Sequence, residues 1–311
     1  MDGSLQRHVG GVRLVSLVTV ETIQPEKVAD LSYCRALEEG NILFFPRTPF
    51  ELPEADRAFL LRQRQVGAGY HKNIAYRPRQ DRVSGFVKQD PADAERLRQV
   101  LHDYSARVVA FATRLFPAYA RAWRLDFASF SPQEEAGRAL GLRARNDLLH
   151  VDAFPTRPSG GDRILRIFTN INPAAERVWL TGDTFERLAE RFAVASGLLT
   201  RARRGGIGWS LRRLARGAGL PVGVRSPYDA FMMSFHHFMK ENEAYQQAAA
   251  KERHTFPPGS TWIVFTDMVS HAVLSGQYAL EQTFIIARES LALPAKAPVA
   301  ILERIAGAPM A

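Results

Sequence analysis

The segment Leu148-Leu149-His150-Val151-Asp152-Ala153-Phe154 decides how this chain of 311 residues is interpreted. Polar and apolar side chains alternate in it, as in a β-strand with one buried face. Side chains two positions apart lie on the same face of a strand, so His150 and Asp152 would project together. A neighbouring imidazole and carboxylate provide two of the three ligands of a facial metal site, which leaves three coordination positions open. The segment therefore predicts an oxygenase-type metal site on a strand.

The third ligand of such a site has to come from another strand that lies beside this segment. His271 is the best candidate, because it follows the apolar run 262–269 and would lie at the end of a buried strand. His236 and His237 lie in the middle of a predicted helix, and we interpret them as core or substrate-contacting residues. The predicted metal ligands, which also form the catalytic centre, are His150, Asp152 and His271.

An arginine, Arg166, interrupts the otherwise apolar strand predicted at residues 164–168. A charge inside an apolar strand is costly unless it is paired. Its partner could be a carboxylate of the protein or a bound dicarboxylate such as 2-oxoglutarate, because a guanidinium binds carboxylates bidentately. Arg288, at the end of the strand predicted after His271, is a second candidate for the same role.

The rest of the sequence predicts an α+β protein. Helices are expected over residues 54–66 and 91–124, and Pro117 should kink or break the second of them. A further helix should begin at Ser226, because a capping serine is followed there by proline at the first helical position. The strand-like runs concentrate in the C-terminal half, which favours a β-sandwich or barrel there. No linker separates autonomous domains.

The net charge of +9 and a pI of about 10 indicate an acidic partner. Between Glu190 and Asp229 the chain has no acidic residue and eight arginines, and residues 211–216 form a short basic amphipathic piece. We interpret this segment as a contact with an anionic membrane. A solvated loop is the alternative. Nucleic-acid binding is not expected, because no reader motif and no interleaved aromatic residues are present.

The composition gives no sign of a membrane-spanning or secreted protein. No run approaches the roughly 18 apolar residues of a membrane span, and no signal peptide is recognisable. Cys34 is the only cysteine, so no intrachain disulfide can form, which suits a reducing compartment.

Several long motifs resemble the Kdo 3-hydroxylase family: the run 150–170, Asn172-Pro173, Arg177-Val178-Trp179 and the run 236–242. The resemblance implies a dioxygenase that uses Fe(II), 2-oxoglutarate and O2 to hydroxylate the 3-position of Kdo on lipid A, giving Ko. It also implies a double-stranded β-helix (jelly-roll or cupin-like) core flanked by helices. We expect one domain over residues 1–311, in which a helical part at about 50–125 packs on a core at about 126–290. The expected location is the cytoplasm, peripheral to the inner face of the inner membrane.

Carried over residue by residue, the resemblance makes His150, Asp152 and His271 the metal ligands. It associates Arg166, Arg177 and Trp179 with 2-oxoglutarate, and Arg288 is a rival for the same role. The sequence has Ser131 where an arginine is expected in the family, which puts the role of that position in doubt.

Two other functions are compatible with these features. The first is a 2-oxoglutarate oxygenase that acts on another acidic metabolite. The second is a non-catalytic basic protein that binds membranes or nucleic acid. The sequence makes no prediction of the oligomeric state.

Overall fold

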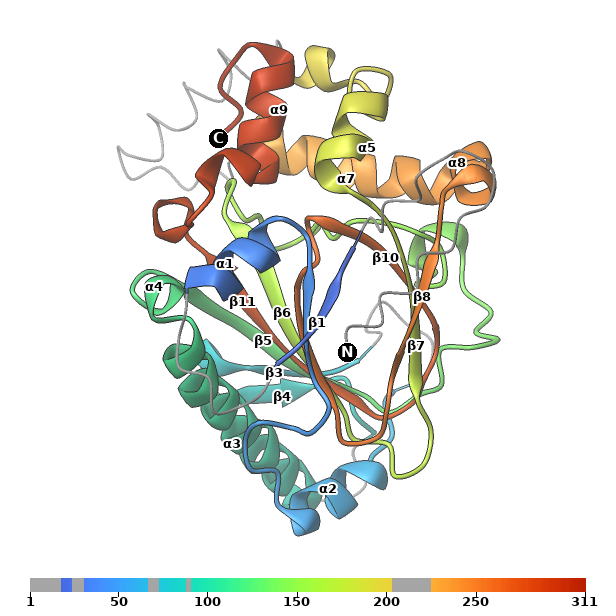
Figure 1. Ribbon diagram of the computed structural model, residues 1–311. Coiled ribbons are helices and arrows are strands. Elements are labelled where there is room, and N and C mark those ends of the chain that lie inside the picture. The colour runs from blue at the N-terminus through green and yellow to red at the C-terminus, as the bar shows by residue number, and fades with distance from the viewer. Residues whose placement is uncertain (1–17, 24–30, 67–72, 88–90, 203–224) are drawn as a thin grey trace, which may run out of the picture.

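The computed structural model describes residues 18–23, 31–66, 73–87, 91–202 and 225–311. In this part of the chain two β-sheets face each other, and helices cover the outside of the larger sheet and one end of the structure (Figure 1). The arrangement confirms the predicted α+β class and the double-stranded β-helix core flanked by helices.

The larger sheet contains strands from both halves of the chain. Its order is β1-β2-β9-β6-β11-β5-β3-β4, and all neighbours are antiparallel except β1 and β2. The strands are β1 (Val20–Thr22), β2 (Ile42–Phe45), β9 (Thr261–Phe265), β6 (Arg163–Asn170), β11 (Ala279–Ile286), β5 (Arg124–Ser131), β3 (Ile74–Arg77) and β4 (Arg82–Ser84).

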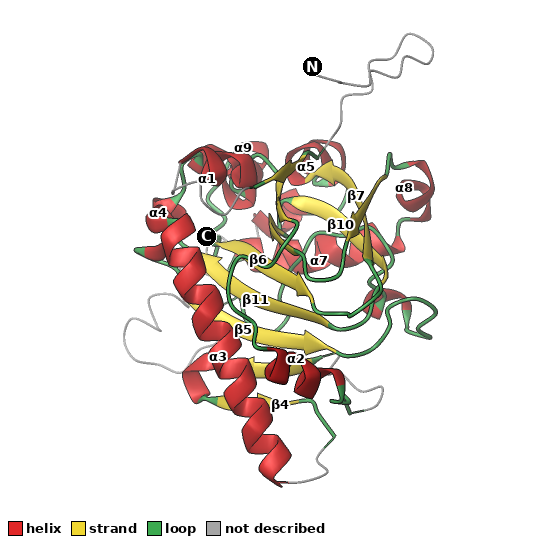
Figure 2. Ribbon diagram, turned by 60° about the horizontal axis from the view of Figure 1, so that its bottom comes forward, coloured by secondary structure: helices red, strands yellow, loops and turns green. Residues whose placement is uncertain are grey.

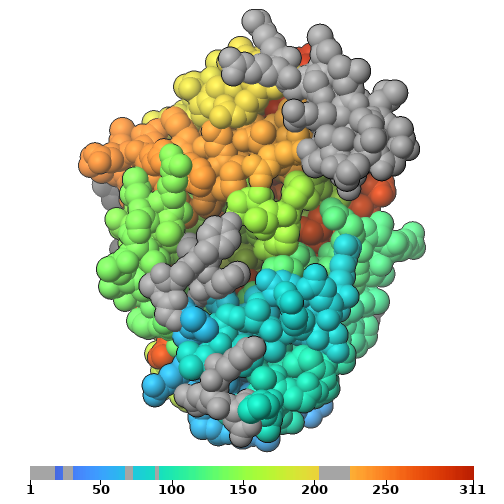
Figure 3. Space-filling model, turned by 180° about the vertical axis from the view of Figure 1, so that it is seen from behind, coloured from blue at the N-terminus to red at the C-terminus, as the bar shows by residue number. Residues whose placement is uncertain are grey.

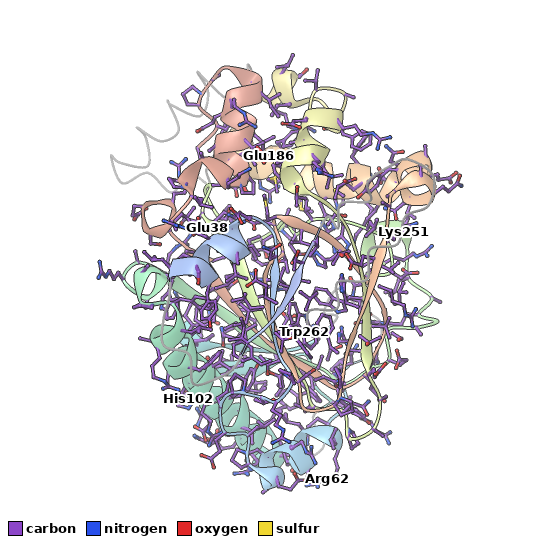
Figure 4. The ribbon with its side chains drawn as sticks, in the orientation of Figure 1. Glu38, Arg62, His102, Glu186, Lys251 and Trp262 are labelled. Carbon is purple, nitrogen blue, oxygen red and sulfur yellow. The ribbon has the colours of Figure 1, made fainter. Side chains whose placement is uncertain are left out.

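The smaller sheet has the order β10-β7-β8, and its strands are antiparallel. They are β10 (Val269–Ser275), β7 (Arg177–Thr184) and β8 (Glu252–Phe256). Trp262 of the larger sheet packs against Trp179 and Phe256 of the smaller one, with ring centroids 5.6 and 4.0 Å apart. Trp262 lies between the two sheets in Figure 4. This aromatic contact holds the sheets at the spacing that encloses the site described below.

Helices cover the outer face of the larger sheet. The long helix α3 (Pro91–Leu115) runs along that face, with α2 (Glu54–Leu61) beside it and α4 (Pro117–Ala120) after its C-terminal end (Figure 2). Pro117 separates α3 from α4, as predicted. The helix predicted at 54–66 ends earlier, at Leu61. The range 50–125 is not purely helical, because β3 and β4 form a hairpin that extends the sheet and buries Ile74 and Tyr76.

A second group of helices closes one end of the structure: α5 (Phe185–Phe192), α7 (Pro227–Glu241) and α9 (Pro298–Ala306), with α8 (Glu243–Ala248) following α7 and α1 (Leu31–Glu38) nearby (Figure 1). Helix α7 begins as predicted: the Ser226 hydroxyl accepts a hydrogen bond from the Asp229 amide at 3.0 Å, and Pro227 occupies the first helical turn. This cap fixes where α7 starts and so which of its side chains face the sheets.

The apolar run 262–269 is not one strand, which corrects the sequence-based interpretation. Strand β9 ends at Phe265, a turn covers 266–268, and β10 begins at Val269. The cause is a fully buried ion pair at 3.0 Å between Asp267 in the turn and Arg163 at the start of β6. His271 therefore lies inside β10, on the smaller sheet, and not at the end of the preceding strand.

None of the helices in the described residues is long and apolar enough to cross a membrane. Most of the basic segment predicted to contact a membrane, residues 203–224, lies outside the described residues.

Candidate metal centre and cosubstrate site

His150 and His271 lie next to each other across an isolated antiparallel bridge. The amide of each residue donates a hydrogen bond to the carbonyl of the other, at 3.1 and 2.9 Å, and the two ring centroids are 4.8 Å apart. The prediction that a distant histidine lies beside His150 is therefore confirmed. Outside this bridge the segment 151–154 is not part of a strand, although the sequence predicted one.

Asp152 nevertheless faces His150, as the alternation predicted. Its Oδ1 lies 3.8 Å from Nε2 of His150, while Leu149 and Val151 are buried in the core. The Asp152 amide donates to the carbonyl of Thr266 at 2.8 Å, so the turn after β9 fixes the backbone of the segment. The extended conformation comes from these tertiary hydrogen bonds and does not need a continuous strand partner.

Each histidine of the pair is oriented by the backbone. Nδ1 of His150 donates to the carbonyl of Leu148 at 2.7 Å, and Nδ1 of His271 donates to the carbonyl of Val269 at 2.8 Å. Because a carbonyl only accepts, the proton is on Nδ1 and the lone pair of Nε2 is free for a metal. Burial lowers the pKa of both side chains, so both are neutral at pH 7, the form that binds metals.

A third histidine, His236 of α7, reaches the same place. Its ring centroid is 4.9 Å from that of His150, and the candidate ligand atoms of His150, Asp152 and His236 lie within 4.8 Å of one another. Its Nδ1 donates to the carbonyl of Val151 at 2.8 Å, so its Nε2 is also free. From the sequence, His236 is predicted to lie in the core or against substrate, so its place beside His150 was missed.

Asp152 is also held by Arg166. Nη1 of Arg166 donates to Oδ2 of Asp152 at 2.8 Å, and Nη2 donates to Glu281 at 2.8 Å. Burial, the largest single influence, raises the pKa of Asp152, but the Arg166 guanidinium together with His271, a hydrogen bond from Thr266 and His236 lowers that pKa to about 2. Of the two kinds of partner considered for Arg166, the structure shows protein carboxylates, those of Asp152 and Glu281. The arginine therefore orients a predicted metal ligand.

Arg177 and Trp179 lie on the same face of β7 and are both buried. The Trp179 ring stacks on His271, with centroids 5.1 Å apart and planes inclined by 18°. Nη1 of Arg177 donates to the carbonyl of Gly276 at 2.9 Å. Gly276 has φ +127°, and a Cβ there would lie 2.7–2.9 Å from Arg177, so the close approach requires glycine.

Two buried donors on this face lack an acceptor among the described residues: Nε of Arg177 and Nε1 of Trp179. A buried donor without a partner costs roughly 1–3 kcal/mol, so a bound anion beside β7 would be stabilised there. The hydroxyl of Ser131 on β5 is likewise buried without a partner. These atoms fit a small dicarboxylate next to the histidine pair.

Arg288 is not brought to this site. It begins a short 3-10 helix (Arg288–Ser290) beyond the end of β11, its side chain is 41% exposed, and its ion-pair partner is Glu303 of α9 at 4.0 Å. The cosubstrate role was predicted for Arg288 because it follows the strand that comes after His271. The chain turns toward α9 after β11 ends, so the side chain pairs with Glu303 instead.

The donor set suits a mononuclear metal. Two of the three neutral imidazoles with free Nε2 atoms, together with the ionised carboxylate of Asp152, match the facial arrangement that holds non-haem iron and leaves positions open. The buried donors of Arg177 and Trp179 add a place for an anionic cosubstrate beside it. The residues present therefore fit both Fe(II) and 2-oxoglutarate.

Comparison with known proteins agrees with this geometry. A match to the family of 3-deoxy-D-manno-oct-2-ulosonic acid (Kdo) hydroxylases covers residues 20–309. One similar solved structure is the Kdo hydroxylase KdoO, a non-heme Fe(II) alphaketoglutarate dependent dioxygenase, in complex with alphaketoglutarate and Fe(III). It is 34% identical, with 94% of this chain and 97% of that chain covered and a TM-score of 0.77.

Two other structures of KdoO show the same likeness. The complex with cobalt(II) is 34% identical, with coverage of 95% and 97% and a TM-score of 0.78. The complex with succinate and Fe(III) is 33% identical, with the same coverage and a TM-score of 0.76. No match was found among the curated proteins. With a family match over nearly its whole length, this chain belongs to the Kdo hydroxylase family.

Proposed function

We propose that this protein hydroxylates Kdo carried on lipid A at the 3-position, giving Ko, and that it uses Fe(II), 2-oxoglutarate and O2. The observation that carries the proposal is the cluster of His150, Asp152 and His271, in which both Nε2 atoms are free and the carboxylate is ionised. A direct test is succinate formation from 2-oxoglutarate. Kdo-lipid A should stimulate it, and equal rates with and without this acceptor would contradict the proposal.

The metal would be held by Nε2 of His150, Nε2 of His271 and Oδ1 of Asp152. Arg166 occupies Oδ2 of Asp152, which leaves the other oxygen for the metal. When bound, iron with 2-oxoglutarate and O2 supplies the oxidising chemistry that inserts oxygen into a C–H bond. The protein orients the ligands through backbone carbonyls and keeps the centre buried, which limits side reactions with water.

We infer that Arg177 and Trp179 hold 2-oxoglutarate. Their unpartnered N–H groups lie on one face of β7, and Trp179 stacks on His271, so a carboxylate bound there would lie beside the metal. Arg166 remains a secondary candidate, because Asp152 and Glu281 already occupy its guanidinium. Arg288, which faces α9, is a poorer candidate than any of these.

The metal assignment predicts different effects for His271 and His236. We expect His271→Ala to weaken Co(II) binding by more than about a hundredfold. Changes to groups that only orient metal ligands already lower metal affinity by about 10- to 100-fold. His236→Ala should weaken it by tenfold or less. Isothermal titration with Co(II) measures both. A greater loss in the His236 variant would move the third ligand to α7.

The buried histidines predict a pH dependence for the metal-free protein. Burial lowers the pKa of His236 to about 3, whereas in the unfolded chain a histidine titrates near ~6.5. The unfolded state therefore binds protons first, and this contribution to stability is lost as the pH falls from about 6.5 toward 3. We expect the urea midpoint to fall more between pH 7.5 and 5 in the wild type than in His236→Gln. Parallel falls would contradict the assignment of a neutral His236.

We also propose that the protein works at the cytoplasmic face of the inner membrane and contacts its anionic surface through the arginines of residues 201–225. Each basic residue near an anionic leaflet contributes about 1 kcal/mol. The variant R212Q/R213Q/R216Q should therefore cosediment less with anionic vesicles than the wild type. As a control with equal loss of charge, R47Q/R64Q/R114Q should cosediment normally. If the wild type bound equally well to neutral and to anionic vesicles, the proposal would be contradicted.

A further inference from the structure

A pocket of about 410 Å³ lies beside β3 and β5, and its lining differs in character from the metal centre. Its lining includes four arginines but only one acidic residue, Asp126, so the lining carries an excess of three positive charges. We call it the arginine pocket and define it by Arg77, Arg79, Arg124 and Arg157. In Figure 3 the β3–β4 hairpin (cyan) and the residues that follow Asp152 (light green) lie on one face of the molecule, with a hollow between them.

The pocket has an aromatic base that orients two of its arginines. The guanidinium carbon of Arg157 lies 3.9 Å from the ring centroid of Phe127, and that of Arg77 lies 4.9 Å from the same centroid. Arg157 also lies over Phe154, at 4.4 Å. Stacking uses the flat faces of a guanidinium and leaves its N–H donors pointing outward in the plane. Nη1 of Arg77 also donates to the Ser84 hydroxyl at 2.6 Å, and Nη1 of Arg157 donates to Asp126, so both cations are held in place and their other N–H groups could meet an anion.

Gathering these cations costs energy in the absence of a ligand. Burial lowers the pKa of Arg77, and the positive charges of Arg82 and Arg157 lower it further. Two acidic groups offset part of the charge: Asp126 pairs with Arg157, and Asp162 pairs with Arg124 at 3.1 Å. The cationic excess remains, and an anion in the pocket would relieve it.

The arginine pocket continues the inner face of the larger sheet outward from the metal centre. Arg166, which holds Asp152, lies opposite Thr283 of β11. The pairing of β11 with β5 is irregular at this level and brings residues 126–127 opposite Thr283. Tyr76 pairs with Ala128, so Arg77 follows next to Phe127. From β6 to β3 this row crosses three strand spacings of about 4.8 Å, or roughly 14 Å.

We propose that the arginine pocket binds a phosphate group of the acceptor glycolipid while the sugar to be hydroxylated lies at the metal centre. The inference rests on the proposed function, which makes that acceptor a phosphorylated lipid. A phosphate monoester carries up to two negative charges and three acceptor oxygens, which suits several arginines better than a single carboxylate would. The pocket is separate from the buried donors of Arg177 and Trp179, so it would set acceptor choice and not cosubstrate binding.

The test compares two acceptors, Kdo-lipid A with its phosphates and the same lipid after phosphatase treatment. We expect wild-type kcat/KM to be about tenfold higher for the phosphorylated acceptor, the value of one good charge-assisted hydrogen bond. The ratio should fall toward one in R77Q/R79Q. In R77K, which keeps the positive charge, it should lie between that value and the wild-type ratio. R114Q, which removes an exposed arginine from α3 on the opposite face of the sheet, should keep the wild-type ratio.

Arg79 is exposed, so R79Q alone provides a variant that removes charge without disturbing the core, and it should lower the ratio by a smaller amount. A wild-type ratio of one would overturn the inference, and so would an unchanged ratio in R77Q/R79Q.

Titration with inorganic phosphate separates this inference from the proposed function. Heat of binding in the wild type and in R114Q, absent in R77Q/R79Q, would support the pocket even if neither lipid were hydroxylated. In that case the proposed function alone would fail. Phosphate binding without any preference for the phosphorylated lipid would assign the pocket to free phosphate and would contradict a glycolipid subsite.

Discussion

Replacing Asp152 by alanine should lower hydroxylation by more than about a hundredfold. The carboxylate is the one anionic ligand proposed for the metal, and its pKa of about 2 keeps it ionised at any working pH. Groups that merely orient ligands contribute about 10- to 100-fold, so loss of the ligand itself should exceed that range. The measurement is the rate of oxygen incorporation into Kdo-lipid A at saturating Fe(II) and 2-oxoglutarate.

Asp93→Ala is the matched control, because Asp93 is exposed in the first turn of α3, away from the centre. It should retain wild-type activity. Arg166 keeps its second partner, Glu281, in the Asp152 variant, so the fold should survive the change. Substantial turnover by a folded Asp152→Ala protein would show that the carboxylate is not a ligand.

Replacing Arg163 by methionine should destabilise the fold by about 3–5 kcal/mol. Arg163 and Asp267 are completely buried and form an ion pair at 3.0 Å. The substitution would leave the Asp267 carboxylate buried with no cation. Burial already raises the pKa of Asp267, so the lone carboxyl should take up a proton and the loss should be smaller at pH 5 than at pH 8. Urea denaturation at the two pH values measures both effects.

The double variant R163M/D267N is the control for this pair. Asparagine keeps an acceptor for the Ile164 amide, which now donates to Asp267 at 3.2 Å, and it carries no charge. Most of the lost stability should return, because replacing both members of a buried pair by neutral groups is often nearly neutral. A double variant as unstable as R163M would mean that packing, and not the unpaired charge, causes the loss.

Local patterns in the sequence were sufficient to bring together two of the predicted metal ligands. Alternation placed His150 and Asp152 on one face, and the structure has their side chains 3.8 Å apart. His271 was identified correctly as the neighbour of His150. The prediction placed it at the end of one strand over 262–269, whereas it lies inside β10. The turn at 266–268 depends on the pairing of Asp267 with Arg163, residues 104 positions apart, which no local pattern reveals.

Features that depend on long-range packing were not predictable. His236 reaches the centre because α7 crosses the end of the sheets, and its sequence context is that of an ordinary buried helix residue. The strands β3 and β4 have four and three residues, too short for a clear period, and gain their stability by extending the sheet at β5. For Arg166 the sequence permitted two kinds of partner, and only the fold brings Asp152 and Glu281 to it.

Mass spectrometry of Kdo-lipid A after incubation with the enzyme tests whether the protein hydroxylates this lipid. With Fe(II), 2-oxoglutarate and O2 present, the lipid should gain one oxygen atom on its Kdo. Omitting Fe(II) or 2-oxoglutarate should abolish the gain, and so should the substitution Asp152→Ala. An unmodified lipid under complete conditions, from protein shown to bind metal, would contradict the account.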